Sequence, residues 1–177
     1  SKCEKIIFLS SVYVYSGTKV HNKNSNIIST FPIEPLGKSK FFCESIIENI
    51  SKVSPLKCIC LRAFTIYGKG SDKNQFVSST INKFKSKNKS ISFGNGSIMR
   101  DFIYIEDVCR AIFYSFNKFK DLKGDFLPMD LASGKSISVK TSVKTISKIL
   151  NIKKQCNFGQ FYKKRRIGDN NHYANIS

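Results

Sequence analysis

Two short apolar runs with a helical pattern between them open the chain. Residues 5–9 form a continuous apolar run after Lys5 and end in Ser10-Ser11, which is typical of a strand buried on both faces of a parallel sheet. Residues 37–50 carry apolar side chains at helical spacing, and residues 56–64 cluster apolar side chains again. Strand, helix and strand in this order predict a β-α-β unit with parallel strands and a right-handed crossover.

Polar and apolar segments continue to alternate after this unit. Residues 16–30 are rich in Lys, Asn and Ser and predict an exposed loop. A helix is expected over residues 76–84. Short strands are expected over 91–93 and 101–105, with a tight hairpin turn at Gly94-Asn95-Gly96 between them rather than a phosphate cradle.

The last part of the chain repeats this alternation. Asp107 is placed to cap a helix that carries Val108, Ala111, Ile112 and Phe116. A strand is expected over residues 126–131, a turn at Ser133-Gly134 and a helix over 141–150. The whole pattern predicts an α/β fold without internal repeats.

The charge of the chain invites a nucleic-acid function, but its make-up argues against one. The chain has 177 residues, of which 41% are hydrophobic, so it can bury a core despite a net charge of +18. Most of the basic residues are scattered Lys, which keep a surface solvated, and no aromatic ladder runs between them to stack bases. We keep a basic nucleic-acid-binding module only as a remote alternative.

The six cysteines indicate neither a metal site nor a disulfide framework. They contain no C-x-x-C pair, and both His lie far from them in sequence, so we expect no zinc site. Most lie in apolar runs, where a free thiol behaves as a small hydrophobe, and a reducing compartment is the simpler inference. No run is long enough to span a membrane and nothing resembles a signal peptide, so we expect a cytoplasmic location.

Several motifs in one order resemble the NAD-dependent epimerase/dehydratase family, which are extended short-chain dehydrogenases/reductases that act on nucleotide sugars. The matching segments are residues 10–15 (SSVYVY), 35–40 (PLGKSK), 61–68 (LRAFTIYG), 94–108 (GNG…RDFIYIEDV), 132–139 (ASGKSISV) and 165–169 (RRIGD). Each motif alone is weak, but their order and spacing are specific to the family.

The resemblance implies a fold and a division of the chain. It implies the C-terminal part of a Rossmann-like, doubly wound parallel sheet with a small mixed α/β substrate-binding subdomain. Residues 1–70 would be the back portion of the NAD(P)-binding domain. Residues 71–177 would be mainly substrate-binding, with interleaved Rossmann elements.

Two departures from the family limit what the resemblance implies. The Gly-rich turn that presents helix N–H groups to the NAD pyrophosphate is absent, so we expect a fragment of a longer protein that is marginally stable or prone to aggregate alone. The family's Tyr-x-x-x-Lys pair keeps Lys40 but has Leu36 at the tyrosine position. Because leucine cannot exchange a proton, we expect impaired catalysis, and we do not expect Tyr13 to replace the lost base.

The remaining site residues follow from the same motifs. Ser11 and Lys40 would be the catalytic residues that remain, and with Phe64 they would contact NAD or NADP. Their alternative roles are a strand-end serine, a surface lysine and a core phenylalanine. The residues that would bind the nucleotide diphosphate sugar are Thr65, Arg100, Arg166, Asp169 and Tyr173. No metal is implied.

The function implied is an NAD(P)-dependent nucleotide-sugar epimerase or dehydratase, which oxidises a sugar hydroxyl by hydride transfer. The alternative is an inactive homologue that binds nucleotide sugar or dimerises. Phe41, Phe42 and Ile46 on the Lys40 helix would suit the family's homodimer bundle.

Overall fold

Three parallel strands form the first sheet of the molecule. A computed structural model describes residues 3–17 and 30–159 of the chain. In this part the order is β1 (Lys5–Ser11), β2 (Lys57–Ala63) and β6 (Phe126–Leu131), and both pairs are parallel. The predicted strands at 5–9, 56–64 and 126–131 are therefore confirmed, and so is the expectation that the first two are parallel.

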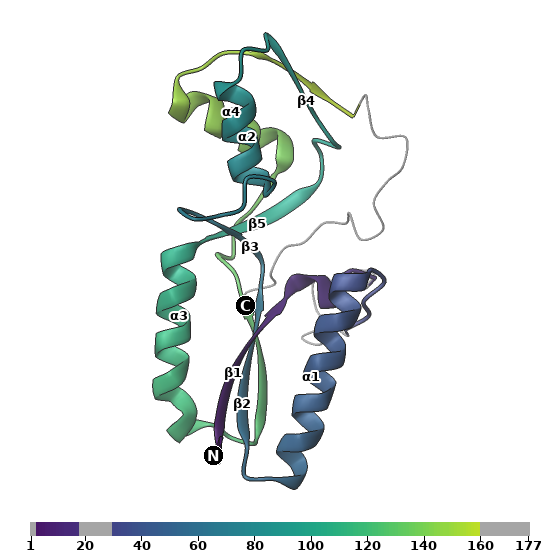
Figure 1. Cartoon of the computed structure of the whole chain (residues 1–177), viewed down its shortest axis with the longest axis vertical. Helices are drawn as coiled ribbons and strands as arrows, with labels where there is room; N and C mark the ends of the chain where they lie inside the picture. Colours follow the sequence, from purple (N-terminus) through teal and green to yellow (C-terminus); the bar gives the residue numbers. More distant parts are fainter. Residues whose placement is uncertain (1–2, 18–29, 160–177) are drawn as a thin grey trace.

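Two long helices flank this sheet, one on each side (Figure 1). Helix α1 (Pro35–Val53) connects β1 to β2 and extends the predicted helix at both ends. It begins with Pro35, whose missing N–H has no cost in the first turn, and Glu34 caps it by accepting from the N–H groups of Leu36 and Gly37. Helix α3 (Ile105–Lys118) lies opposite. These five elements are called the first lobe.

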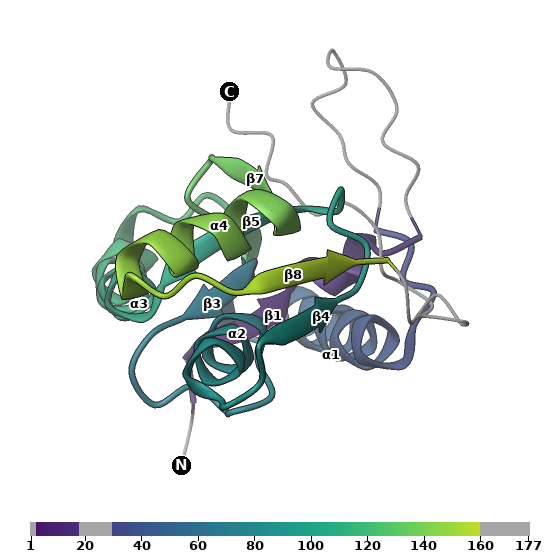
Figure 2. The ribbon, with the colours of Figure 1, turned by 90° about the horizontal axis from the view of Figure 1, so that it is seen from above.

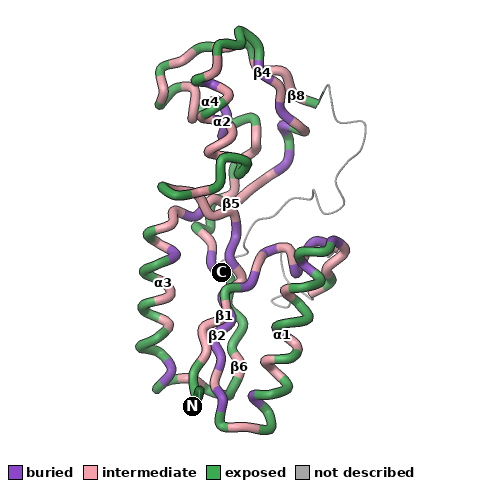
Figure 3. The backbone as a smooth tube through the Cα atoms, viewed as in Figure 1, coloured by how far each residue is buried: buried purple, intermediate pink, exposed green. Residues whose placement is uncertain are grey.

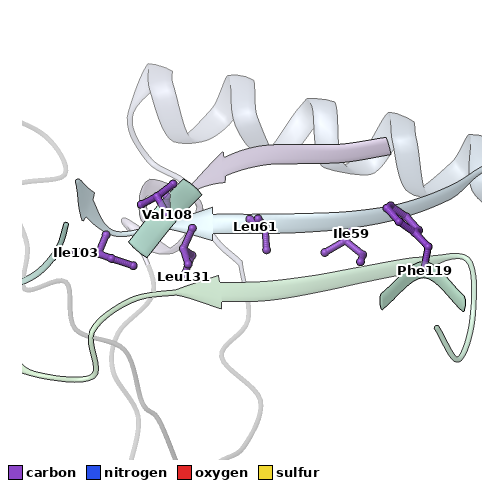
Figure 4. Packing of buried hydrophobic residues seen from close by; sticks show 7 residues of the cluster. Ile59, Leu61, Ile103, Val108, Phe119 and Leu131 are labelled. Carbon is purple, nitrogen blue, oxygen red and sulfur yellow. The ribbon is translucent and has the colours of Figure 1, made fainter. Parts of the chain in front are cut away.

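The core of the first lobe lies between the sheet and α3. Ile59 and Leu61 of β2 and Leu131 of β6 pack with Val108 and with Phe119, which belongs to the short helix η2 (Phe119–Asp121) (Figure 4). These side chains are all buried. Many residues of α1 and α3 are exposed, as the green parts of the tube in Figure 3 show.

A second lobe contains two helices and a two-stranded parallel sheet. Helices α2 (Phe76–Lys85) and α4 (Val139–Leu150) pack with strands β4 (Ser90–Phe93) and β8 (Gln155–Phe158), which lie side by side (Figure 2). Phe84, Ile91, Phe93 and Val143 form a separate buried core here.

A small mixed sheet joins the two lobes. Its order is β3 (Thr65–Tyr67), β5 (Met99–Tyr104) and β7 (Ser136–Ser138). Strands β3 and β5 are parallel, whereas β5 and β7 are antiparallel. The fold is α/β, with a Rossmann-type parallel sheet and a smaller mixed α/β part, as the sequence predicts.

The predicted hairpin at Gly94-Asn95-Gly96 is wrong. Strand β4 pairs with β8, and β5 pairs with β3 and β7, so the two strands belong to different sheets. Gly96 is needed for close packing instead, because a Cβ at this position would lie 2.8 Å from Phe158 Cδ1. Its carbonyl oxygen accepts from the Lys140 N–H at 2.9 Å, which ties the turn to the start of α4.

Two further expectations need correction. Asp107 does not cap α3: the N-cap is Tyr104, and Asp107 lies in the first turn, where its charge favours the helix dipole and pairs with Arg110. Strand β1 is only partly buried, with Leu9 among the exposed apolar residues, because β1 has one paired neighbour in the described part of the chain. No helix within residues 3–17 and 30–159 is long and apolar enough to cross a membrane.

Candidate functional site

A cavity of about 930 Å³ lies where the first lobe meets the second. Its lining includes residues that follow the carboxyl ends of β1 and β2, and others from α2, β4 and β5. The carboxyl edge of a parallel sheet is the usual place for a ligand site in this class of fold. Ser11, Phe64, Thr65 and Arg100, four of the residues singled out from sequence, line it.

Ser11 reaches the cavity from the last position of β1. It is also the N-cap of the short helix η1 (Val12–Tyr15), since its Oγ accepts from the Tyr13 N–H at 3.3 Å. Val12 and Tyr13 line the cavity beside it. The start of α1 packs closely on this turn, because a Cβ at Gly37 would overlap the Tyr13 carbonyl oxygen. Ser11 therefore has a local structural role and a place in the cavity at once.

Phe64 and Thr65 bring the end of β2 to the same cavity. Phe64 is buried, and its N–H donates to the Leu131 carbonyl oxygen at 3.0 Å. Thr65 begins β3 and pairs with Phe102 in β5. The hydrogen bond to Leu131 holds Phe64 in place, and the pairing of β3 with β5 holds Thr65 in place. Phe64 is therefore a buried core residue that also lines the cavity.

Two cations line the cavity, and one of them was not expected. Arg100 lies in β5, and one of its guanidinium nitrogens donates to the Met99 carbonyl oxygen at 3.2 Å. Lys83 in α2 donates to the Ser92 carbonyl oxygen at 2.7 Å, and its Nζ lies 4.6 Å from the centre of the Phe93 ring. In sequence Lys83 is one of four alternating lysines, so no local signal separates it from a solvated surface residue. Among the described lining residues none is acidic.

Leu36 and Lys40 are not among the residues that line the cavity. Leu36 lies in the first turn of α1 and is 49% exposed. The Lys40 ammonium donates to the Leu9 carbonyl oxygen at 2.9 Å and lies 5.1 Å from the centre of the Phe8 ring. The family resemblance implies a place at the reaction centre for both positions, which stays a prediction, and in this structure Lys40 joins α1 to β1.

A network of charged and polar groups, buried at Glu44 and exposed at Asp130, lies in the first lobe, and sequence reasoning missed it. Glu44 of α1, only 3% exposed, accepts two hydrogen bonds from Arg62 Nε, a third at 2.7 Å from a terminal guanidinium nitrogen, and one from the Ser10 hydroxyl. The other terminal nitrogen of Arg62 donates to the Tyr15 hydroxyl at 2.7 Å, which donates to Asp130 Oδ1 at 2.8 Å. The network thus links α1, η1 and all three strands of the first sheet.

The network changes the proton affinities of its members. Burial raises the pKa of Tyr15, Asp130 raises it further, and Arg62 opposes both, so Tyr15 stays a neutral donor. Burial alone would lower the pKa of Arg62, but its hydrogen bonds to Glu44 raise it above its ordinary value. Partial burial raises the pKa of Asp130, although the hydrogen bond from Tyr15 and the charge of Arg62 oppose this.

Three residues predicted to bind substrate, Arg166, Asp169 and Tyr173, lie outside the described residues. Within residues 3–17 and 30–159 no group of three or more His, Cys, Asp or Glu side chains could hold a metal ion.

Comparisons with known proteins agree on one family. The model of the NAD dependent epimerase/dehydratase family matches residues 1–126. The dTDP-4-dehydro-6-deoxyglucose reductase of Escherichia coli is 31% identical over 158 residues, which cover 85% of this chain and 47% of that protein. The UDP-glucose 4-epimerase of Mycoplasma genitalium is 28% identical over 146 residues, which cover 73% of this chain and 43% of that protein.

A solved structure shows the same fold. MoeE5 in complex with UDP-glucose and NAD superposes with a TM-score of 0.76 at 24% identity, covering 93% of this chain and 53% of MoeE5. The chain therefore spans about half the length of the proteins it matches. Because the family model covers most of the chain and the fold agrees, this protein belongs to the NAD dependent epimerase/dehydratase family.

Proposed function

We propose that the cavity binds a nucleotide diphosphate sugar, as in an NAD(P)-dependent nucleotide-sugar epimerase or dehydratase. The observation that carries this proposal is the charge of the cavity wall: Lys83 and Arg100 line it, and none of the other described lining residues is acidic. A diphosphate carries the complementary charge, and the guanidinium fork of Arg100 suits paired oxygens. A volume of about 930 Å³ is in the range of ligand pockets.

The cofactor would bind in the part of the cavity lined by Ser11 and Phe64, whereas the diphosphate would bind beside Lys83 and Arg100. Ser11 and Phe64, a hydroxyl and an aromatic face, suit the nicotinamide and ribose of NAD or NADP. The fit is partial, because Lys40 donates to the Leu9 carbonyl oxygen and the sequence has no Gly-rich turn for the pyrophosphate. MoeE5, bound to NAD and UDP-glucose, supports the assignment of both ligands to this fold.

Proton transfer is the step we expect to be impaired. A leucine at position 36 has no proton to exchange, and the Lys40 ammonium is engaged at the end of β1. Both observations favour the second candidate, a homologue that binds nucleotide sugar without turning it over. In either case residues 1–70 would contribute the back of the cofactor domain and residues 71–177 mainly the substrate-binding region.

Binding of UDP-glucose to the full chain tests the proposed site. Calorimetry of the wild type, Arg100→Gln and Arg110→Gln compares two changes of equal charge, since Arg110 lies exposed on α3. We expect binding by the wild type and by Arg110→Gln, and a loss of about tenfold or more in Arg100→Gln, the size of a charged hydrogen bond. Equal loss in both variants, or no binding by the wild type, would contradict the proposal.

We also propose that the full-length protein forms a homodimer through α1. Helix α1 carries an exposed apolar stripe at helical spacing, made of Phe42, Ile46, Ile50 and Val53. The family resemblance places the homodimer bundle at this same helix. Sedimentation equilibrium of Ile46→Glu, with the exposed Ile149→Glu of α4 as control, is the test. A dimer disrupted only by Ile46→Glu is expected, and a wild-type monomer at high concentration would exclude this contact.

A further inference from the structure

The hydroxyl of Tyr15 has both of its hydrogen-bonding roles filled by charged groups. It accepts from Arg62 at 2.7 Å and donates to Asp130 at 2.8 Å. The Arg62 guanidinium also lies 5.2 Å from the centre of the Tyr15 ring. Arg62 is itself held by the buried Glu44, so one of the two partners of the hydroxyl is anchored in the interior of the first lobe, whereas Asp130 is exposed near the end of β6.

Tyr15 is the last residue of η1, and the first part of this turn forms the cavity wall. The turn has four residues, and an isolated 3-10 turn of this length has little stability of its own. Its beginning is fixed by Ser11 in β1, and backbone bonds such as Gly17 N–H to the Phe31 carbonyl oxygen, 2.7 Å, fix the chain beyond it. Between these two points the Tyr15 hydroxyl adds a second side-chain attachment to that of Ser16, whose Oγ accepts from the Ile33 N–H at 3.0 Å.

We propose that Tyr15 is a positioning residue: its hydroxyl, held between Arg62 and Asp130, sets where Ser11 and Tyr13 stand in the cavity. The role in ligand binding rests on the proposed function, whereas the position of Tyr13 can be measured without ligand. Tyr15 itself is not among the residues that line the cavity, so it acts through the turn and not by contact with a ligand.

The test measures two quantities: the NMR resonance of Tyr13, which reports its position, and the affinity for UDP-glucose. The full chain labelled with ¹³C at the ζ carbon of its seven tyrosines gives one resonance for each, and Tyr13→Phe assigns the resonance of Tyr13. Tyr15→Phe keeps the ring but removes the hydroxyl. Tyr114, exposed on α3, does not line the cavity, so Tyr114→Phe is the control. Calorimetry with UDP-glucose is run on the same samples.

We expect the Tyr13 resonance to move in Tyr15→Phe and not in Tyr114→Phe, with UDP-glucose affinity reduced about fivefold or more, as for one lost hydrogen bond. An unmoved Tyr13 resonance in folded Tyr15→Phe overturns the inference, and so does a moved resonance with unchanged affinity. If the wild type binds no UDP-glucose, the proposed function fails, and the resonance alone decides the positioning role.

A pair of changes at Asp130 provides a second route if Tyr15→Phe does not fold. Asp130→Asn keeps an acceptor oxygen for Tyr15 and should leave the Tyr13 resonance and the affinity close to wild type. Asp130→Ala removes the acceptor and should reproduce the effect of Tyr15→Phe. If the two changes at Asp130 acted only by lowering stability, the folded Asp130→Asn and Asp130→Ala proteins would show the same Tyr13 resonance. Equal Tyr13 resonances in the two variants would therefore overturn the role of the contact between Tyr15 and Asp130.

Discussion

The ammonium of Lys40 donates to the carbonyl oxygen of Leu9, 2.9 Å away, and so joins the first half of α1 to β1. The same ammonium lies 5.1 Å from the centre of the Phe8 ring. A lysine one helical turn after Leu36 would otherwise have been expected to face the position of a tyrosine hydroxyl. The contact gives Lys40 a structural role that needs neither cofactor nor substrate.

Replacement of Lys40 by Met should therefore destabilise the fold without weakening ligand binding. The loss of one charged hydrogen bond and one cation–π contact at a partly exposed site predicts about 1 kcal/mol of lost unfolding free energy. Urea unfolding of Lys40→Met against Lys38→Met, an exposed lysine of the same helix, measures it. A stable Lys40→Met that no longer binds UDP-glucose would show that the lysine serves the cavity instead.

Restoring a tyrosine at position 36 should raise any oxidation of the sugar. Leu36→Tyr places a phenol one turn before Lys40, the spacing at which an ammonium lowers a phenol pKa. NADH formation from UDP-glucose and NAD is the measurement, with Leu36→Phe as the control for ring size. Equal rates for the tyrosine and phenylalanine variants would mean that the missing hydroxyl is not what limits catalysis.

Asp101 should be needed for stability through the turn that follows β6. Its fully buried carboxylate accepts from the N–H groups of Ser133 and Gly134, at 2.8 and 2.9 Å, and from the Ser133 hydroxyl at 2.7 Å. Asp101→Ala leaves the N–H groups of Ser133 and Gly134 without this acceptor, which predicts a loss of about 3 kcal/mol in unfolding free energy. Asp101→Asn keeps part of the contact and should lose less. Similar melting temperatures for alanine and wild type would contradict this role.

Five of the six thiols should separate into a reactive and a protected group, with the partly buried Cys156 between them. Cys3, Cys43 and Cys109 are exposed, whereas Cys58 and Cys60 are buried in β2. Burial raises the pKa of Cys58 to about 11 and that of Cys60 still higher, where the charge of Glu44 adds to the effect. A thiol reagent at pH 8 should modify the exposed three first, and mass spectrometry of peptides identifies them. Early labelling of Cys60 would mean that β2 opens readily.

The raised pKa of Asp130 should lower the free energy of unfolding of the protein as pH rises. Because partial burial raises its pKa in the folded state above the ordinary 3.8, the folded state holds this proton more tightly than the unfolded state. The resulting stabilisation is present at low pH and is lost as pH rises through the raised pKa. The free energy of unfolding of Asp130→Asn relative to wild type should therefore increase from pH 4 to pH 7. A difference that is constant or decreases over this range would contradict the raised pKa.

The first lobe could be predicted from sequence because its signals are local. The apolar runs of β1, β2 and β6, and the helical spacing between the first two, specify a parallel unit without reference to distant residues. Strand β8 has no such signal: residues 155–158 become a strand only because β4 offers an edge and Phe158 stacks on Phe93, with ring centres 5.5 Å apart.

The candidate site was predicted in part for the same reason. Ser11, Phe64 and Thr65 lie at or just after the ends of β1 and β2, so the first sheet brings them to one cavity, and Arg100 reaches it from β5. Lys83 and the partners of Tyr15 could not be found in this way. Their roles depend on contacts across long stretches of chain, such as Tyr15 with Asp130, and an isolated lysine or aspartate in sequence carries no sign of such a contact.

The pairing of β4 with β8 also sets an order of events during synthesis. Strand β4 is translated well before β8, and α3, β6 and α4 all lie between them in the chain. Until residues 155–158 leave the ribosome, the edge of β4 lacks its paired strand and the ring of Phe93 lacks the stacked ring of Phe158. The second lobe must therefore close after translation of nearly the whole described chain, and chaperone binding during this interval should centre on β4.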